Sequence, residues 1–248
     1  MSTCCVIIIE ATTSPLIPQV TAAWLARCAQ ACATQLNRDV APIWGGGSWG
    51  VRVGSGPTDV HPGEMVFSIV DQLPDAPGAV AYHDVAGAAV PVAFLALATC
   101  QTLDDVSTAI SHELCETAGD EACNLWADDG AGHEWARELC DAVESGWYNV
   151  DLGEGQSPIK VSDFLLPAFF APGATGPLSF VASTSPASAS FPSAPFATAA
   201  GGYQLQRSSG AGETQVTADS ASRRGALARA RKHHWSSRPA RRGLRPSP

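Results

Sequence analysis

The residues best suited to chemistry lie in the segment I-S-H-E-L-C-E-T-A-G-D, residues 110–120. His112 and Glu116 are four residues apart, so on a helix both side chains leave the same face and could bind one metal ion. Glu113 stands where the pattern H-E-x-x-H places the general base that takes a proton from a metal-activated water. The segment therefore predicts a metal site of the form H-E-x-x-E. The simpler alternative is a solvated helix face with an exposed histidine.

The residues before and within the motif predict the helix that would position it. Residues 102–105, T-L-D-D, resemble a capping box, in which a hydroxyl and an acid satisfy the first turn of a helix. We expect this helix to run from about Leu103 to Ala118, with Gly119 as its flexible stop. One apolar stripe would anchor it to a sheet and leave the motif facing a cleft. The stripe consists of Val106, Ile110 and Leu114.

A tetrahedral metal ion needs a third protein ligand and leaves its fourth position to water. Downstream, the sequence predicts a second helix from about His133 to Ser145, closed by Gly146. Glu138 and Asp141 are three residues apart and would share one face of that helix. Either carboxylate is therefore a candidate partner for the first motif.

This arrangement resembles the zinc peptidases called gluzincins. In those enzymes a glutamate on a second helix joins the H-E-x-x-H helix, and an acid one turn further supports a ligand histidine. Here Glu138 follows Glu116 by 138 − 116 = 22 residues, and Asp141 lies one turn beyond. The resemblance implies that His112, Glu116 and Glu138 bind the metal and that Asp141 orients His112, although Glu138 and Asp141 could exchange these roles.

A closer resemblance is to a group of uncharacterised phage and bacterial proteins, and more distantly to plant phosphate-induced (exordium-type) proteins. It rests on S-H-E-L-C-E-T-A-G-D at 111–120, E-L-C-D at 138–141 and V-S-D-F-L-L-P at 161–167. The chain departs from the pattern at Glu121 and Ala142, where proline is usual. The resemblance implies a zincin-like fold, in which a mixed sheet packs on an active-site helix and a second ligand-bearing helix.

Patterning over the rest of residues 1–170 favours one α/β (α+β) domain. Apolar runs predict strands, and helical spacing of apolar residues predicts a helix from Gln19 to about Asn37. His83, after a predicted strand at 79–82, either lines a cleft or is a hydrogen-bonded structural residue. The other predicted strands are 4–9, 51–53, 65–70 and 91–98, and a hairpin of 147–150 with 159–161 closes the domain.

Composition divides the remainder of the chain. Residues 1–203 carry 5 basic and 22 acidic residues, a net charge of 5 − 22 = −17, whereas residues 204–248 carry 10 − 2 = +8. The acidic body argues against nucleic acid as its partner. Residues 171–203 are predicted to be a Ser/Ala/Pro-rich disordered linker and 204–248 a basic disordered tail. Such a tail suits nonspecific contact with nucleic acid or anionic surfaces, or is a solubilising extension.

Other features concern location and the cysteines. No apolar stretch approaches the roughly 18 residues of a membrane span. The first ten residues lack the pattern of a signal peptide, which favours a cytoplasmic location, with virion association as the alternative. The eight cysteines are expected to be mostly buried thiols rather than disulfides.

Together these patterns predict a metal-dependent hydrolase, a zincin-type peptidase acting on peptide or protein substrates with Zn²⁺. One histidine with two carboxylates makes a hard, anionic site, so Ca²⁺, Mn²⁺ and Fe²⁺ are alternatives. A second hypothesis is a non-catalytic protein of a phage or cell envelope, in which the same cluster holds a structural ion.

Overall fold

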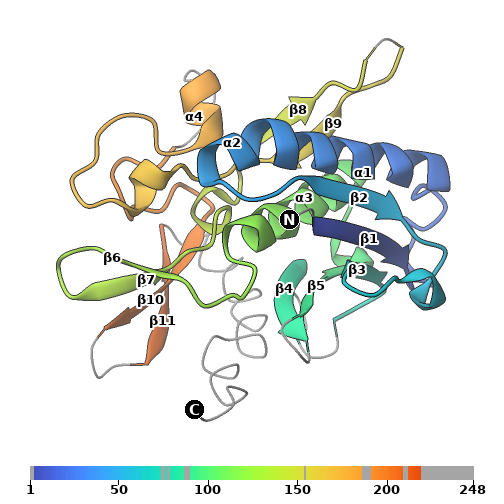
Figure 1. The fold of residues 1–248 in the computed structure, drawn as a ribbon, viewed down its shortest axis with the longest axis horizontal. Helices are drawn as coiled ribbons and strands as arrows, with labels where there is room; N and C mark the ends of the chain where they lie inside the picture. The colour runs from blue at the N-terminus through green and yellow to red at the C-terminus, as the bar shows by residue number, and fades with distance from the viewer. Residues whose placement is uncertain are drawn as a thin grey trace.

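The main body of the computed structural model is a five-stranded mixed sheet in the order β2-β1-β3-β5-β4 (Figure 1). The structure describes residues 3–73, 76, 79–86, 90–153, 155–185, 191–208 and 212–218. Neighbouring strands from β2 to β5 run parallel, and β4 is antiparallel to β5 at the sheet edge. The strands are β1 (Thr3–Ile9), β2 (Trp49–Val53), β3 (Met65–Val70), β4 (Ala81–Ala86) and β5 (Val90–Ala96).

The centre of the sheet is apolar on both faces. In β1, residues 5–8 are all buried, as expected for an inner parallel strand covered by helices. Helix α1 (Ala22–Gln35) starts at Thr21, whose hydroxyl accepts a hydrogen bond from the backbone N–H of Trp24. A π-helical turn (Leu36–Val40) and the short α2 (Ala41–Trp44) continue from it.

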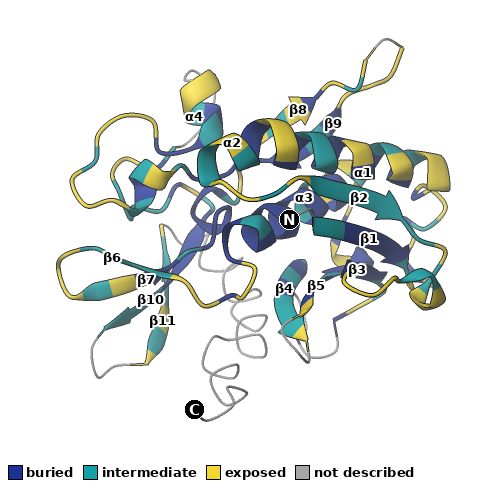
Figure 2. Cartoon of the chain, viewed as in Figure 1, coloured by how far each residue is buried: buried dark blue, intermediate teal, exposed yellow. Residues whose placement is uncertain are grey.

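Helix α3 (Leu103–Gly119) carries the H-E-x-x-E motif and crosses the middle of the molecule (Figure 1). The expected capping box is present, because the Thr102 hydroxyl accepts from the Asp105 N–H and the Asp105 carboxylate accepts from the Thr102 N–H. The predicted apolar stripe of α3 is fully buried, and the helix packs against β4, β5 and β9. Figure 2 shows the helix as mostly buried. The predicted α/β class, with a mixed sheet packed on the motif helix, is confirmed.

The prediction of a second, ligand-bearing helix at 133–145 is wrong. Residues 126–136 instead form a hairpin of β6 (Trp126–Asp128) and β7 (His133–Ala136). The Asp129 carboxylate organises its turn by accepting from the backbone N–H of His133 and the ring N–H of Trp135. After β7 the chain is irregular except for a 3-10 turn at Asp141–Val143. The turn sequence D-D-G-A-G is the signal that favours a hairpin over a helix here.

The prediction of disorder from residue 171 is also wrong for the described segments. The short helix α4 (Phe180–Thr184) lies in the predicted linker, while β10 (Tyr203–Ser208) and β11 (Glu213–Thr217) extend into the predicted tail. The two strands join a second sheet of order β11-β10-β7-β6. Aromatic contacts hold this region on the body, since Phe180 stacks on Phe164 at a centroid distance of 4.9 Å. Residues 186–190, 209–211 and 219–248 of the predicted linker and tail lie outside the described residues.

The remaining elements close the domain as expected. The hairpin of β8 (Trp147–Val150) and β9 (Ile159–Ser162) is confirmed, and the Ser111 hydroxyl of α3 accepts from the Ser162 N–H at 2.7 Å. All eight cysteines are free thiols and all but Cys4 are buried, as predicted. Within the described residues, no helix combines the length and the apolar character needed to cross a membrane.

The pair of Arg52 on β2 and Glu64 before β3 predicts an acid dependence of stability. Two hydrogen bonds of 2.6 and 2.8 Å from Arg52, together with the His61 N–H, lower the pKa of Glu64 from its usual 4.5 to about 2. Because the folded-state pKa is the lower one, the contribution is present above pH 4.5 and is lost as the pH falls towards 2. Urea unfolding of the wild type and Glu64→Gln should differ most at neutral pH and converge near pH 2. A difference that is the same at pH 7 and pH 3 would contradict this assignment.

Candidate metal centre

The five residues predicted to form a site come together in the interior, although the elements that carry them differ from the expectation. His112, Glu113 and Glu116 lie on consecutive turns of α3. Glu138 lies in the irregular segment after β7, and Asp141 begins the 3-10 turn. The exposed fractions of these five residues lie between 0% and 6%. A loop therefore supplies the carboxylates that the sequence analysis placed on a helix.

Backbone hydrogen bonds to distant segments of the chain hold the loop that carries Glu138 and Asp141 in place. The carbonyl of Leu139 accepts from the Leu165 N–H at 2.7 Å, and the carbonyl of Ala142 accepts from the Ala199 N–H at 2.9 Å. Residues 165 and 199 both lie far along the sequence. These contacts fix Glu138 and Asp141 against α3 by tertiary structure alone.

One half of the cluster surrounds His112. Its Nε2 lies 3.0 Å from Glu116 Oε1 and 3.2 Å from Asp141 Oδ1, while its Nδ1 lies 3.9 Å from Glu144 Oε2. The ring therefore presents one nitrogen to Glu116 and Asp141 and the other to Glu144. Asp141 lies on the ligand side of His112, and Glu144 lies in the position expected of an orienting carboxylate. The sequence analysis had assigned the orienting role to Asp141 with exchange left open, and it had not singled out Glu144.

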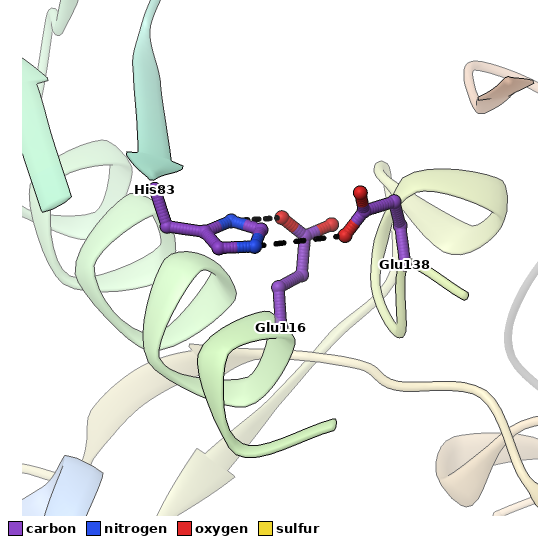
Figure 3. Close-up of side chains that lie close together, drawn as sticks. All are labelled: His83, Glu116 and Glu138. Carbon is purple, nitrogen blue, oxygen red and sulfur yellow. Dashed lines mark ion pairs between the residues drawn. The ribbon is translucent and has the colours of Figure 1, made fainter. Parts of the chain in front are cut away.

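The other half of the cluster surrounds His83, on the edge strand β4 (Figure 3). His83 Nδ1 lies 3.2 Å from both Glu113 Oε2 and Glu116 Oε2. Its Nε2 lies 3.7 Å from Glu138 Oε2. Glu138 thus faces His83, whereas the resemblance to gluzincins placed it with His112. His83 is thus a buried, hydrogen-bonded residue, as one of the two alternatives left open for it requires, and its neighbours are acids of the cluster.

Three overlapping groups in this cluster have the spacing of a cation site. In each group one ligand atom from every residue lies within 4.8 Å of the others. Atoms bound at about 2.1 Å to one tetrahedral ion are about 3.4 Å apart, and the imidazole–carboxylate pairs of the cluster, at 3.0–3.9 Å, lie near this value. The groups are His83–Glu116–Glu138, His112–Glu113–Glu116 and His112–Asp141–Glu144.

The net negative charge of the cluster also favours a bound cation. Its buried carboxylates are Glu113, Glu116, Glu138 and Asp141, and it contains two imidazoles. Even with both imidazoles protonated, these six groups would carry 2 − 4 = −2. Burial of uncompensated carboxylates is costly, because the interior solvates charge poorly. A divalent cation would compensate this charge.

Two side chains provide more direct evidence for an ion. In the described residues, neither carboxylate oxygen of Glu116 makes a hydrogen bond, and neither does His83 Nε2. The two Glu116 oxygens are within 3.2 Å of imidazole nitrogens, but in directions that do not form hydrogen bonds. Buried polar atoms nearly always have a partner. Buried nitrogen and oxygen atoms that lie close together without a hydrogen bond form an arrangement that a metal ion could satisfy.

The acidic surroundings also favour protonation of both imidazoles in the metal-free cluster. Burial lowers the pKa of His83, but the effect is outweighed by Cys123 and by the carboxylates of Glu113 and Glu116, so the pKa is raised well above its usual range. The pKa of His112 is likewise raised, because Glu116 and its acidic neighbours outweigh burial. Protons thus compensate the carboxylates when no ion is bound. A metal ion would displace them, because imidazole ligands must be deprotonated.

A small pocket of about 20 Å³ borders the cluster. Its wall includes His112 and Glu113 from α3, Ala81 from β4, and Tyr203 from β10. Tyr203 is only 1% exposed, so the last residue of the segment predicted as a disordered linker forms part of the wall of the candidate site. The pocket reaches the residue proposed as base and one of the two imidazoles.

The end of α3 is matched closely to the loop that carries Glu138. Gly119 has no positive φ, so it is not the flexible stop predicted from the sequence; a Cβ there would lie 2.5 Å from Leu139 Cγ. Overpacking of about 1–3 kcal/mol should exceed the gain of up to about 1 kcal/mol in helix propensity. The net cost of up to about 2 kcal/mol is expected to lower the Tm of Gly119→Ala by up to about 8 °C.

Differential scanning calorimetry would measure this effect. Gly212→Ala is the matched control, since no atom lies within 4 Å of the added Cβ and its φ is not positive. A Tm of Gly119→Ala at or above the wild-type value would contradict the close packing.

Comparisons of the chain with protein-family models, curated proteins and solved structures found no match.

Proposed function

We propose that this protein is a metal-dependent hydrolase, in which His112, Glu116 and Asp141 hold a divalent cation and Glu113 is the general base. The main support is that one buried imidazole nitrogen, His112 Nε2, lies 3.0 Å from Glu116 Oε1 and 3.2 Å from Asp141 Oδ1. Zn²⁺ is the proposed ion, and Mn²⁺, Fe²⁺ and Ca²⁺ are alternatives that the hard donor set also accepts. When bound, the ion would supply a Lewis acid and an activated water.

The protein's own side chains have distinct roles in this proposal. The Nδ1–H of His83 donates to Glu113 at 3.2 Å and holds the base in position. Glu144, near His112 Nδ1, keeps the opposite nitrogen of that ring directed at the ion. Glu113 accepts a proton in the reaction and returns it to the leaving group.

A peptide is the proposed substrate. The neighbouring strand β4 lies at the edge of its sheet, and an edge strand offers backbone N–H and C=O groups to an extended chain. His83 belongs to this strand, so a peptide paired along it would pass close to the cluster. The pocket that reaches Glu113 includes Ala81 of the same strand.

Peptide cleavage by the Zn²⁺-loaded full chain tests this proposal. The protein would be incubated with a mixed-sequence peptide library, and the products identified by mass spectrometry. We expect cleavage that stops when a chelator is added and returns when Zn²⁺ is restored. A chain that binds the ion stoichiometrically but cleaves no peptide would favour the non-catalytic, structural role and contradict the hydrolase proposal.

A further inference from the structure

We propose that the cluster binds two divalent cations, bridged by the carboxylate of Glu116. This inference rests on the proposed function, because it adds a second ion to the site described there. The first ion lies among His112, Glu116 and Asp141. The second lies among His83, Glu116 and Glu138.

The position of Glu116 supports a bridge. Its Oε1 lies 3.0 Å from His112 Nε2, and its Oε2 lies 3.2 Å from His83 Nδ1. One carboxylate therefore faces two different imidazoles with its two oxygens. Glu116 is fully buried, and neither oxygen has a hydrogen bond in the described part of the chain. A carboxylate with one oxygen on each ion is a common link in two-metal sites, where the ions are about 3.5–4 Å apart.

His83 is suited to be a ligand of the second ion. Its Nδ1 is hydrogen-bonded to Glu113, and the carboxylate on that side leaves Nε2 with its lone pair. Nε2 has no hydrogen bond within the described residues and lies 3.7 Å from Glu138 Oε2, which is the spacing of two ligands on one ion. Figure 3 shows the carboxylates of Glu116 and Glu138 beside the His83 imidazole, Glu116 at Nδ1 and Glu138 at Nε2.

The two halves resemble each other in part. Each imidazole has acids at both ring nitrogens: His112 has Glu116 and Asp141 at Nε2 and Glu144 at Nδ1, whereas His83 has Glu138 at Nε2 and both Glu113 and Glu116 at Nδ1. Glu116 is the member common to both halves.

The charge balance favours a second ion. The cluster contains five carboxylates when Glu144 is included, and its imidazoles must be neutral to bind metal. One divalent ion would leave 2 − 5 = −3 in this buried volume. Two divalent ions would leave a net charge of 4 − 5 = −1. This smaller uncompensated charge costs less free energy in a medium that solvates charge poorly.

Manganese titration of the metal-stripped full chain tests the proposal. Mn²⁺ binding would be followed by calorimetry, and the loaded protein by electron paramagnetic resonance. We expect two equivalents per chain and the spectrum of a spin-coupled Mn²⁺ pair. His83→Ala is expected to bind one equivalent with an uncoupled spectrum, and Glu121→Gln, an exposed acid beyond α3, is expected to keep two.

The outcomes separate this inference from the proposed function. One equivalent in the wild type, unchanged in His83→Ala, would overturn the two-ion centre and leave the single-ion hydrolase intact. No bound Mn²⁺ and no bound Zn²⁺ would overturn both. The wild-type stoichiometry decides the question even where a variant fails to fold, and circular dichroism reports the folding of each variant.

Discussion

Glu113→Gln is expected to lower the turnover of any peptide that the chain cleaves by about 10²–10⁴-fold, the usual contribution of a general base. The substitution preserves the shape of the side chain and a hydrogen-bond acceptor for His83, which lies 3.2 Å away. It removes the carboxylate that would accept a proton. Metal content is expected to stay at the wild-type level, because Glu113 is a base and not a required ligand in the proposed function.

The measurement is a pair: steady-state kinetics on one cleaved peptide, and elemental analysis of the same preparation. Glu121→Gln makes the same chemical change at an exposed position eight residues along and should retain full activity. Full activity in Glu113→Gln would show that the base lies elsewhere. Loss of metal together with activity would instead make Glu113 a ligand.

Removing the metal is expected to have the largest effect on stability. An ion that binds only the folded chain stabilises it by about 4 kcal/mol when present at 1,000 times its Kd. For a domain of this size each kcal/mol corresponds to about 2–4 °C, so chelation is expected to lower Tm by about 8–16 °C. The physical cause is the buried carboxylates, which without an ion would be compensated by protons, since the pKa values of His83, His112 and Glu116 are all raised.

Calorimetry with and without a chelator measures this change. Glu116→Gln should have a Tm that no longer responds to Zn²⁺, because its carboxylate faces both imidazoles. Glu121→Gln should respond as the wild type does. A wild-type Tm that is the same with chelator and with Zn²⁺ would contradict metal binding by the fold.

Local patterns were sufficient to predict the helix that carries the motif. The capping box at Thr102 and Asp105 and the apolar stripe of α3 depend on residues three and four apart, which the sequence displays directly. The same holds for β1, whose run of β-branched residues is buried in the sheet centre. Helices and strands can be predicted from sequence patterns when neighbouring residues stabilise them or when their apolar residues recur at a regular spacing.

The prediction of a helix at 133–145 was wrong because contacts with distant parts of the chain determine the structure of this segment. Glu138 and Asp141 were interpreted as a polar helix face, but they are buried in the cluster, so their spacing reflects the site and not a solvated surface. The strand that precedes them pairs with β10, where Trp135 lies opposite Gln206. A partner about 70 residues downstream leaves no local periodicity to detect.

The sequence did not predict that His83 lies in the cluster, nor that parts of the chain after residue 171 are ordered, and the two reasons differ. A single histidine on a short strand has no partner at fixed spacing, and only the antiparallel pairing of β4 with β5 places it beside α3. The low-complexity composition after residue 171 concealed Phe180, Phe196 and Tyr203, which pack on the body. Aromatic residues in a Ser/Ala/Pro-rich stretch were the available signal that part of it is ordered.

The central claim is that the buried cluster around Glu116 binds a divalent cation. Elemental analysis of the purified full chain, after exposure to Zn²⁺ or Mn²⁺ and dialysis into metal-free buffer, tests it most directly. The account predicts at least one tightly bound cation per chain in the wild type and a reduced content in Glu116→Gln. A folded wild-type chain that retains neither ion would contradict the account.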